Sequence, residues 1–117
     1  MVLRRAGAAR WSTVLSIAGD LVVDDADRFQ RETLQRLGQD VRDFVLDLES
    51  LDYIDSRGLA SLLWLQDKCN EMLGQVRLAA CPDHVFKVLQ ATRLNTRFDC
   101  HPDVDTAVSS LGHDKTG

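Results

Sequence analysis

One continuous segment constrains the fold of this chain more than any other: residues 44–65, FVLDLESLDYIDSRGLASLLWL. Its first part, Phe44 to Leu48, is nearly all apolar, which is typical of a central strand covered on both faces. Apolar residues then recur at helical spacing from about Ser56 to Leu73. The side of this predicted helix that should face the core holds Gly58, Leu59, Leu62, Leu65, Cys69, Met72 and Leu73. A buried strand that leads through a short acidic loop into an amphipathic helix indicates an α/β domain.

The start of that helix carries a candidate switch residue, Ser56. A serine at this position lies beside the free backbone N–H groups of the first turn, where the helix dipole is positive and a phosphate would be stabilised. Plain helix capping is the alternative role, because serine is a favoured N-cap. Asp55 is open to two interpretations, a second cap or an acid that orients the serine hydroxyl.

The rest of the pattern predicts alternating strands and helices. A tight antiparallel pair should come first, followed by a helix that Asp24 and Asp25 cap and Gly38 ends. The predicted elements are strands Ser12–Ala18 and Leu21–Val23, a helix reaching Leu37, strand Val76–Ala80, a helix from Pro82, strand Thr96–Cys100 and a helix from Pro102-Asp103. This order predicts the α/β class, with a mixed sheet of four to five strands and about four helices packed on it.

The length of 117 residues suits one domain with a substantial core. We expect that domain to span residues 13–112, with residues 1–12 as a flexible N-terminal arm and residues 113–117 as a loose tail. The basic N-terminus lacks the apolar region of a secretion signal, and no apolar run is long enough to insert in a membrane. Three cysteines, an odd number, favour free thiols. These features predict a cytoplasmic protein.

Charge indicates the kind of partner. The formal net charge of -4 argues against nucleic-acid binding, which requires concentrated Lys and Arg. Acidic residues outnumber basic ones between Asp40 and Arg57, around the candidate switch. A basic partner surface is the natural complement of this segment.

A protein-docking surface is predicted around Ser56 and along the polar face of the helix that follows. Trp64 falls on that face and would form an exposed apolar spot, suited either to a partner or to cover by the N-terminal arm with Trp11. The predicted partner-binding residues are Asp52, Asp55, Ser56, Arg57, Ala60, Ser61, Trp64 and Lys68.

Other chemistries lack their motifs. Cys81 and His84 are spaced like half of a metal site, but no second pair matches them, so no metal is expected. The G-x-S-x-G elbow of serine hydrolases is missing around Ser56, and Gly58 alone makes no phosphate-cradling loop. We therefore expect no cofactor and no enzymatic activity.

Taken in order, several short motifs resemble the STAS domain family, the fold of bacterial anti-sigma factor antagonists. The resemblance covers about residues 13–112. Its marks are Gly19-Asp20-Leu21, Val45-Leu46-Asp47-Leu48, Tyr53-Ile54-Asp55-Ser56-Arg57-Gly58-Leu59, Leu73-Gly74 before Val76-Arg77-Leu78, and Leu89 with Leu94 and Phe98.

The resemblance implies a regulatory role for Ser56, which follows the motif aspartate. In antagonists of this family that serine is phosphorylated by a partner that is both an anti-sigma factor and a serine kinase. The unphosphorylated protein then binds this partner and displaces a sigma factor, phosphorylation releases it, and a metal-dependent serine phosphatase resets it. Two residues depart from the family pattern: Arg57 replaces a small hydroxyl residue, and Arg93 stands where glycine is usual.

Two rival functions are compatible with the sequence. Some STAS proteins that resemble this one serve as small subunits of lipid-transport ATPases and dock without phosphorylation. An enzyme that uses Ser56 as its nucleophile is a rival of a different class.

Overall fold

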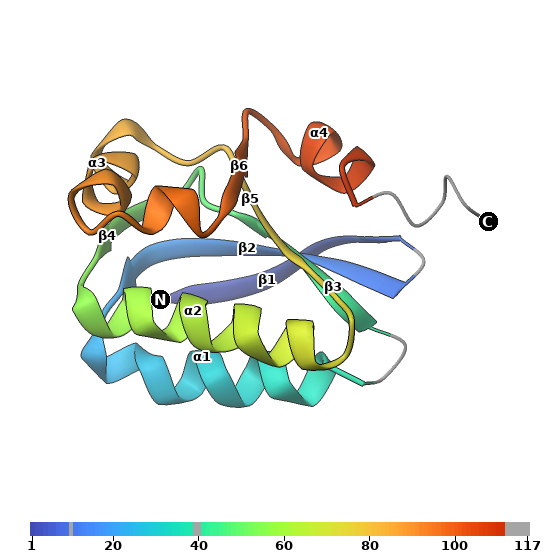
Figure 1. Ribbon diagram of the computed structural model, residues 1–117. Coiled ribbons are helices and arrows are strands. Elements are labelled where there is room, and N and C mark those ends of the chain that lie inside the picture. Colours follow the sequence, from blue (N-terminus) through green and yellow to red (C-terminus); the bar gives the residue numbers. More distant parts are fainter. Residues whose placement is uncertain (10, 39–40, 112–117) are drawn as a thin grey trace.

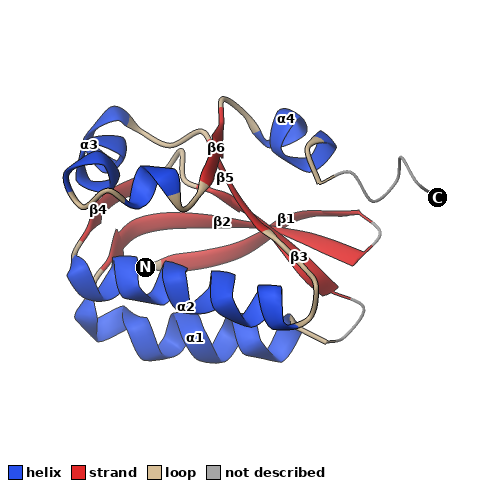
Figure 2. Ribbon diagram, in the orientation of Figure 1, coloured by secondary structure: helices blue, strands red, loops and turns tan. Residues whose placement is uncertain are grey.

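The computed structural model describes residues 1–9, 11–38 and 41–111. Strands and helices alternate along most of the chain, as Figures 1 and 2 show. The elements are β1 (Val2–Ala9), β2 (Trp11–Leu21), α1 (Val23–Arg36), β3 (Val41–Asp47), β4 (Leu51–Ile54), α2 (Ser56–Glu71), β5 (Val76–Ala79), α3 (Asp83–Ala91), the 3-10 helix η1 (Leu94–Thr96), β6 (Asp99–His101) and α4 (Val104–Ser109). Asp40 and the tail 113–117 lie outside the described residues.

The six-stranded sheet is mixed and has the order β1-β2-β3-β5-β6, with β4 paired to β2 off this path. β1 runs antiparallel to β2, and every other pair is parallel. The α/β class and the mixed sheet are therefore confirmed, although the sheet has six strands. Two of the six strands were not predicted: β1, and β4, which occupies part of the segment taken for an acidic loop.

The prediction for the N-terminus was wrong in two respects. Residues 2–9 are not a flexible arm but a strand that pairs with β2 from Val2 opposite Ala18 to Ala9 opposite Ser12. The predicted antiparallel pair is instead one long strand, β2, which Gly19 bends at a φ of 81° where its partner changes from β3 to β4. Leu3 of β1 packs against the main core, an interaction that the basic composition of the segment concealed.

The sheet has a hydrophobic core on each face, because successive strand residues point to opposite sides. On one face, α1 and α2 lie side by side and cover the larger cluster, which includes Leu15, Leu46 and Leu78 (Figure 1). Their strand neighbours Val14 and Val45 face the other way, toward α4. The start of α2 lies on the two-helix side.

Two helix boundaries differ from the prediction. Asp24 and Asp25 lie within the first turn of α1 rather than at its cap, which is Val22. Helix α2 ends at Glu71, and Leu73 then adopts a left-handed φ of 63° and is 83% exposed. Met72 and Leu73, assigned to the core side from helical spacing, therefore lie at the surface because the helix stops before them.

Candidate functional site

The candidate site lies where β4 leads into α2. Strand β4 ends at the buried Ile54, Asp55 is the N-cap, and Ser56 is the first helical residue. The prediction that α2 begins at about Ser56 is therefore confirmed. Ser56 is exposed to solvent.

Asp55 holds the starts of two helices together. Its Oδ1 accepts a hydrogen bond from the Gly58 amide at 2.8 Å, and its Oδ2 accepts one from the amide of Val23, the first residue of α1, at 3.0 Å. The Gly58 bond, supported by the one from Val23, holds the pKa of Asp55 below its ordinary value of 3.8. Both carboxylate oxygens accept from backbone amides, so the structure assigns Asp55 the capping role.

The two helix starts are in close contact. Gly58 lies so near the end of β2 that a Cβ built on it would be 2.2 Å from the carbonyl oxygen of Leu21. The Asp55 amide donates to the same carbonyl oxygen at 3.3 Å. The positive ends of the α1 and α2 dipoles therefore lie together next to Ser56.

The clamp made by Asp55 gives stability a specific pH dependence. Because its pKa is lowered in the folded state, the carboxylate stabilises the fold above the unfolded pKa of about 4, and this stabilisation is lost as pH falls through the lowered folded pKa. We expect Asp55→Asn to lower the melting temperature at neutral pH, since an amide side chain has one acceptor oxygen for two N–H donors.

The measurement is thermal unfolding of both proteins between about pH 7 and about pH 3. The gap in melting temperature should be widest near neutrality and narrow as the acid limb is reached. Asp52→Asn, at an exposed position of β4, is the matched control and should unfold like the wild type at neutral pH. A gap that stays constant across the pH range would contradict the clamp.

The structure brings several predicted docking residues together at the surface. Asp52, Ser56, Arg57 and Ala60 are exposed around the start of α2. Lys68 lies more than two turns further along and pairs with Glu71 at 3.6 Å. We call these four exposed residues the α2-start surface.

Two predicted docking residues are placed differently. Ser61 is fully buried, and its hydroxyl donates to the Arg57 carbonyl oxygen at 3.1 Å, so its assignment to a contact surface is corrected. Trp64 is half-buried and packs against the main hydrophobic cluster, so it is not the exposed apolar spot that was expected. Both lie on the edge of the buried helix face, which is wider than the assumed stripe of apolar residues.

Sequence reasoning missed two exposed apolar residues beside Ser56. Tyr53 in β4 and Val23 at the start of α1 are each 55% exposed. From Leu51 to Ile54 the residues of β4 are buried, exposed, exposed and buried. Strict alternation along a strand would place Tyr53 on the buried side, so it does not predict the exposure of this residue. Nor did the sequence show that α1 and α2 begin at the same place.

The described residues offer little for other chemistries. Within residues 1–9, 11–38 and 41–111, no three His, Cys, Asp or Glu side chains gather in a way that could hold a metal ion. In the same residues no helix combines the length and apolar character needed to cross a membrane. The free cysteines Cys69 and Cys81 are poorly reactive, because burial raises the pKa of each thiol to about 12.

A family model described as STAS domain matches residues 2–107. A STAS-domain containing protein of Pseudomonas aeruginosa is 32% identical over 68 residues, which are 58% of this chain and 67% of that protein.

Similar folds occur among solved structures. A putative anti-sigma factor antagonist from Thermotoga maritima has a TM-score of 0.83 at 17% identity, covering 94% of this chain and 92% of that one. The anti-sigma factor antagonist SpoIIAA in its unphosphorylated form has a TM-score of 0.73 at 16% identity, covering 96% of this chain and 99% of that one. The phosphorylated form of SpoIIAA, from Bacillus, gives 0.74 at 17% identity, with 94% and 99% covered.

Proposed function

The chain belongs to the STAS domain family, and we propose that within it the protein is an anti-sigma factor antagonist switched by phosphorylation of Ser56. In its unphosphorylated form it binds a cytoplasmic anti-sigma factor that is also a serine kinase. Phosphorylation by that partner releases it, and a serine phosphatase restores the binding form.

The exposure of Ser56 beside two helix starts is the observation that carries this proposal. A phosphate there would add about -1.5 to -2 charges to a surface that already presents Asp52. The positive ends of α1 and α2 would stabilise that charge within the protein itself. The modified chain can therefore stay folded while its contact surface changes.

The α2-start surface has the composition of a docking site. The acidic Asp52 suits a basic partner, and Tyr53 and Val23 add apolar contacts at its edge. Tyrosine is also enriched among the residues that dominate binding energy at protein interfaces. Arg57, next to the acceptor, can pair with a phosphate on Ser56 or select the kinase that fits.

Incubation with ATP and the candidate kinase, followed by intact-mass analysis, tests the proposal. Wild-type protein should gain about 80 Da, the mass of one phosphoryl group. Ser56→Ala should gain nothing, whereas Ser50→Ala, which alters another exposed serine near the site, should be phosphorylated like the wild type. A phosphate retained in Ser56→Ala would overturn the assignment of the acceptor.

The rival functions give other outcomes. Co-purification with a transport ATPase, with no change in mass after incubation, would favour a docking subunit. Labelling of Ser56 by a serine-reactive covalent probe would favour a nucleophilic enzyme.

A further inference from the structure

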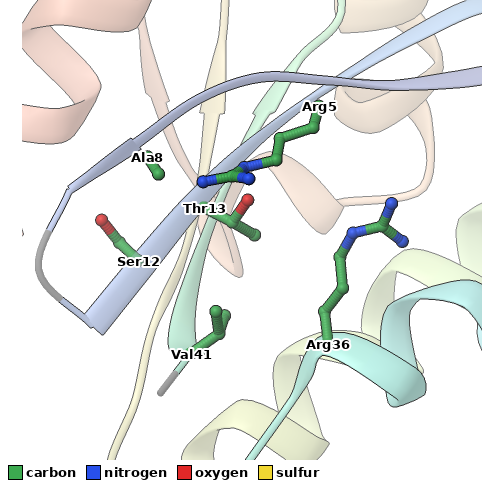
Figure 3. A pocket seen from close by; sticks show the side chains of 6 residues that line it. All are labelled: Arg5, Ala8, Ser12, Thr13, Arg36 and Val41. Carbon is green, nitrogen blue, oxygen red and sulfur yellow. The ribbon is translucent and has the colours of Figure 1, made fainter. Parts of the chain in front are cut away.

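A polar pocket lies at the opposite end of α1 from Ser56. It occupies about 220 Å³ and is lined by Arg5, Ala8, Ser12, Thr13, Arg36 and Val41. Arg5 extends from β1 across the pocket toward Thr13 of β2, and Arg36 rises from the last residue of α1 (Figure 3). Four elements, β1, β2, β3 and α1, therefore meet at this site.

Four of the residues that line the pocket carry side-chain hydrogen-bond donors: Arg5, Ser12, Thr13 and Arg36. Within the residues that the structure describes, neither guanidinium makes an ion pair, and Arg36 uses Nη1 to donate to the Glu32 carbonyl oxygen at 2.9 Å. Ser12 and Thr13 are each only 3% exposed. In the described part of the chain, neither hydroxyl is among the buried side-chain atoms that lack a hydrogen-bond partner, and both line the pocket.

Both hydroxyls line the pocket, so a ligand in that space can accept hydrogen bonds from them. Two guanidinium groups that make no ion pair within the described residues line the same pocket, in a chain with a net charge of -4. An acceptor with several oxygens in that space can pair with guanidinium and hydroxyl donors together. An oxyanion satisfies both the charge and the donors.

We propose that this pocket binds a phosphate group, either as free phosphate or as the end of a small phosphomonoester. Guanidinium forks match phosphate oxygens in bidentate geometry, and hydroxyl donors complete the set. The volume of 220 Å³ falls below the roughly 300 Å³ at which pockets begin to hold whole drug-sized ligands, so the phosphate group itself is the recognised unit. This site is separate from Ser56 and does not rest on its phosphorylation.

Arg36 also has a structural role that the test must separate from binding. It lies in the last turn of α1, where a cation stabilises the negative end of the helix dipole. Its removal can therefore lower the melting temperature without any ligand. The shift caused by the ligand, rather than the melting temperature itself, reports on binding.

The experiment measures thermal unfolding of the full chain against inorganic phosphate, with sodium chloride adjusted to hold ionic strength constant. The wild-type melting temperature should rise and saturate with phosphate. Arg5→Gln and Arg36→Gln should each weaken the fitted affinity about tenfold or more, since each removes charge-assisted hydrogen bonds. Arg4→Gln on β1 and Arg31→Gln on α1 remove equal charge at exposed positions outside the pocket and should keep wild-type affinity.

Each result of this titration either supports or overturns the proposed phosphate site. An unsaturable rise, or an equal loss in the two control variants, would show general ion attraction and overturn the site. Repeating the titration with glycerol phosphate distinguishes the sources: tighter binding than inorganic phosphate identifies a phosphomonoester, and weaker binding identifies the free ion. Acetate at the same concentration should give a smaller shift, because it has two oxygens for the same donors.

Discussion

Replacing Gly58 with alanine is expected to destabilise the protein by about 3 kcal/mol, the upper range for forcing an extra carbon into a packed interior. A Cβ at this position would lie 2.2 Å from the Leu21 carbonyl oxygen and 2.7 Å from Cγ1 of Ile54. The first is a backbone atom at the end of β2, so relief requires separating β2 from α2. The expected sign is opposite to helix propensity, which favours alanine over glycine by about 1 kcal/mol.

Urea unfolding of Gly58→Ala and the wild type measures this difference. Gly7→Ala is the matched control, because its added Cβ would meet Val14 Cγ2 at an ordinary 3.7 Å. We expect the control to stay within about 1 kcal/mol of the wild type. A Gly58→Ala protein as stable as the wild type would show that β2 and the start of α2 are not in the close contact described.

Strong local signals made much of the fold predictable. The apolar run of β3 and the start of α2 at Ser56 were clear, because a buried strand and a helical period differ plainly in sequence. β1 was missed because arginine and alanine hide the alternation of a strand at the sheet edge, where the outer side of the strand needs no burial. Its pairing partner lies in β2, a long-range contact that no local pattern records.

Backbone conformation was less predictable than element order. Arg93, at the position where the family usually has glycine, adopts a left-handed φ of 62°. At the end of α2 the residue with a left-handed φ is Leu73. The adjacent Gly74 has no room for a side chain, because a Cβ there would overlap with the Arg42 carbonyl oxygen. Among the motif glycines, Gly19 has a positive φ whereas Gly58 and Gly74 mark close approach, and sequence alone does not separate the two.

At the candidate site, the sequence predicted the exposed serine but not its surroundings. The contact between the starts of α1 and α2, bridged by Asp55 and Val23, joins segments 32 residues apart. The same applies to Tyr53, whose exposure depends on how β4 pairs with β2. Ser61 and Trp64 were misplaced because the real buried face of α2 is wider than its apolar residues suggest.

Phosphorylation of Ser56 is expected to weaken partner binding by about 5- to 150-fold, the usual range of a regulatory coupling. A docked partner would have to approach a dianion beside Asp52 and strip water from it. Within the free chain the helix starts stabilise the same charge, so the fold should not change. The loss of affinity should therefore arise at the α2-start surface and not from unfolding.

The most direct measurement compares the affinity of one anti-sigma factor for the unphosphorylated and the fully phosphorylated chain by calorimetric titration at the same salt concentration. Amide spectra of both forms verify that each is folded. We expect a large loss of affinity on phosphorylation, recovered by phosphatase treatment, with spectral changes confined to the starts of α1 and α2. Equal affinities of the two forms, or a loss accompanied by spectral changes throughout the core, would contradict it.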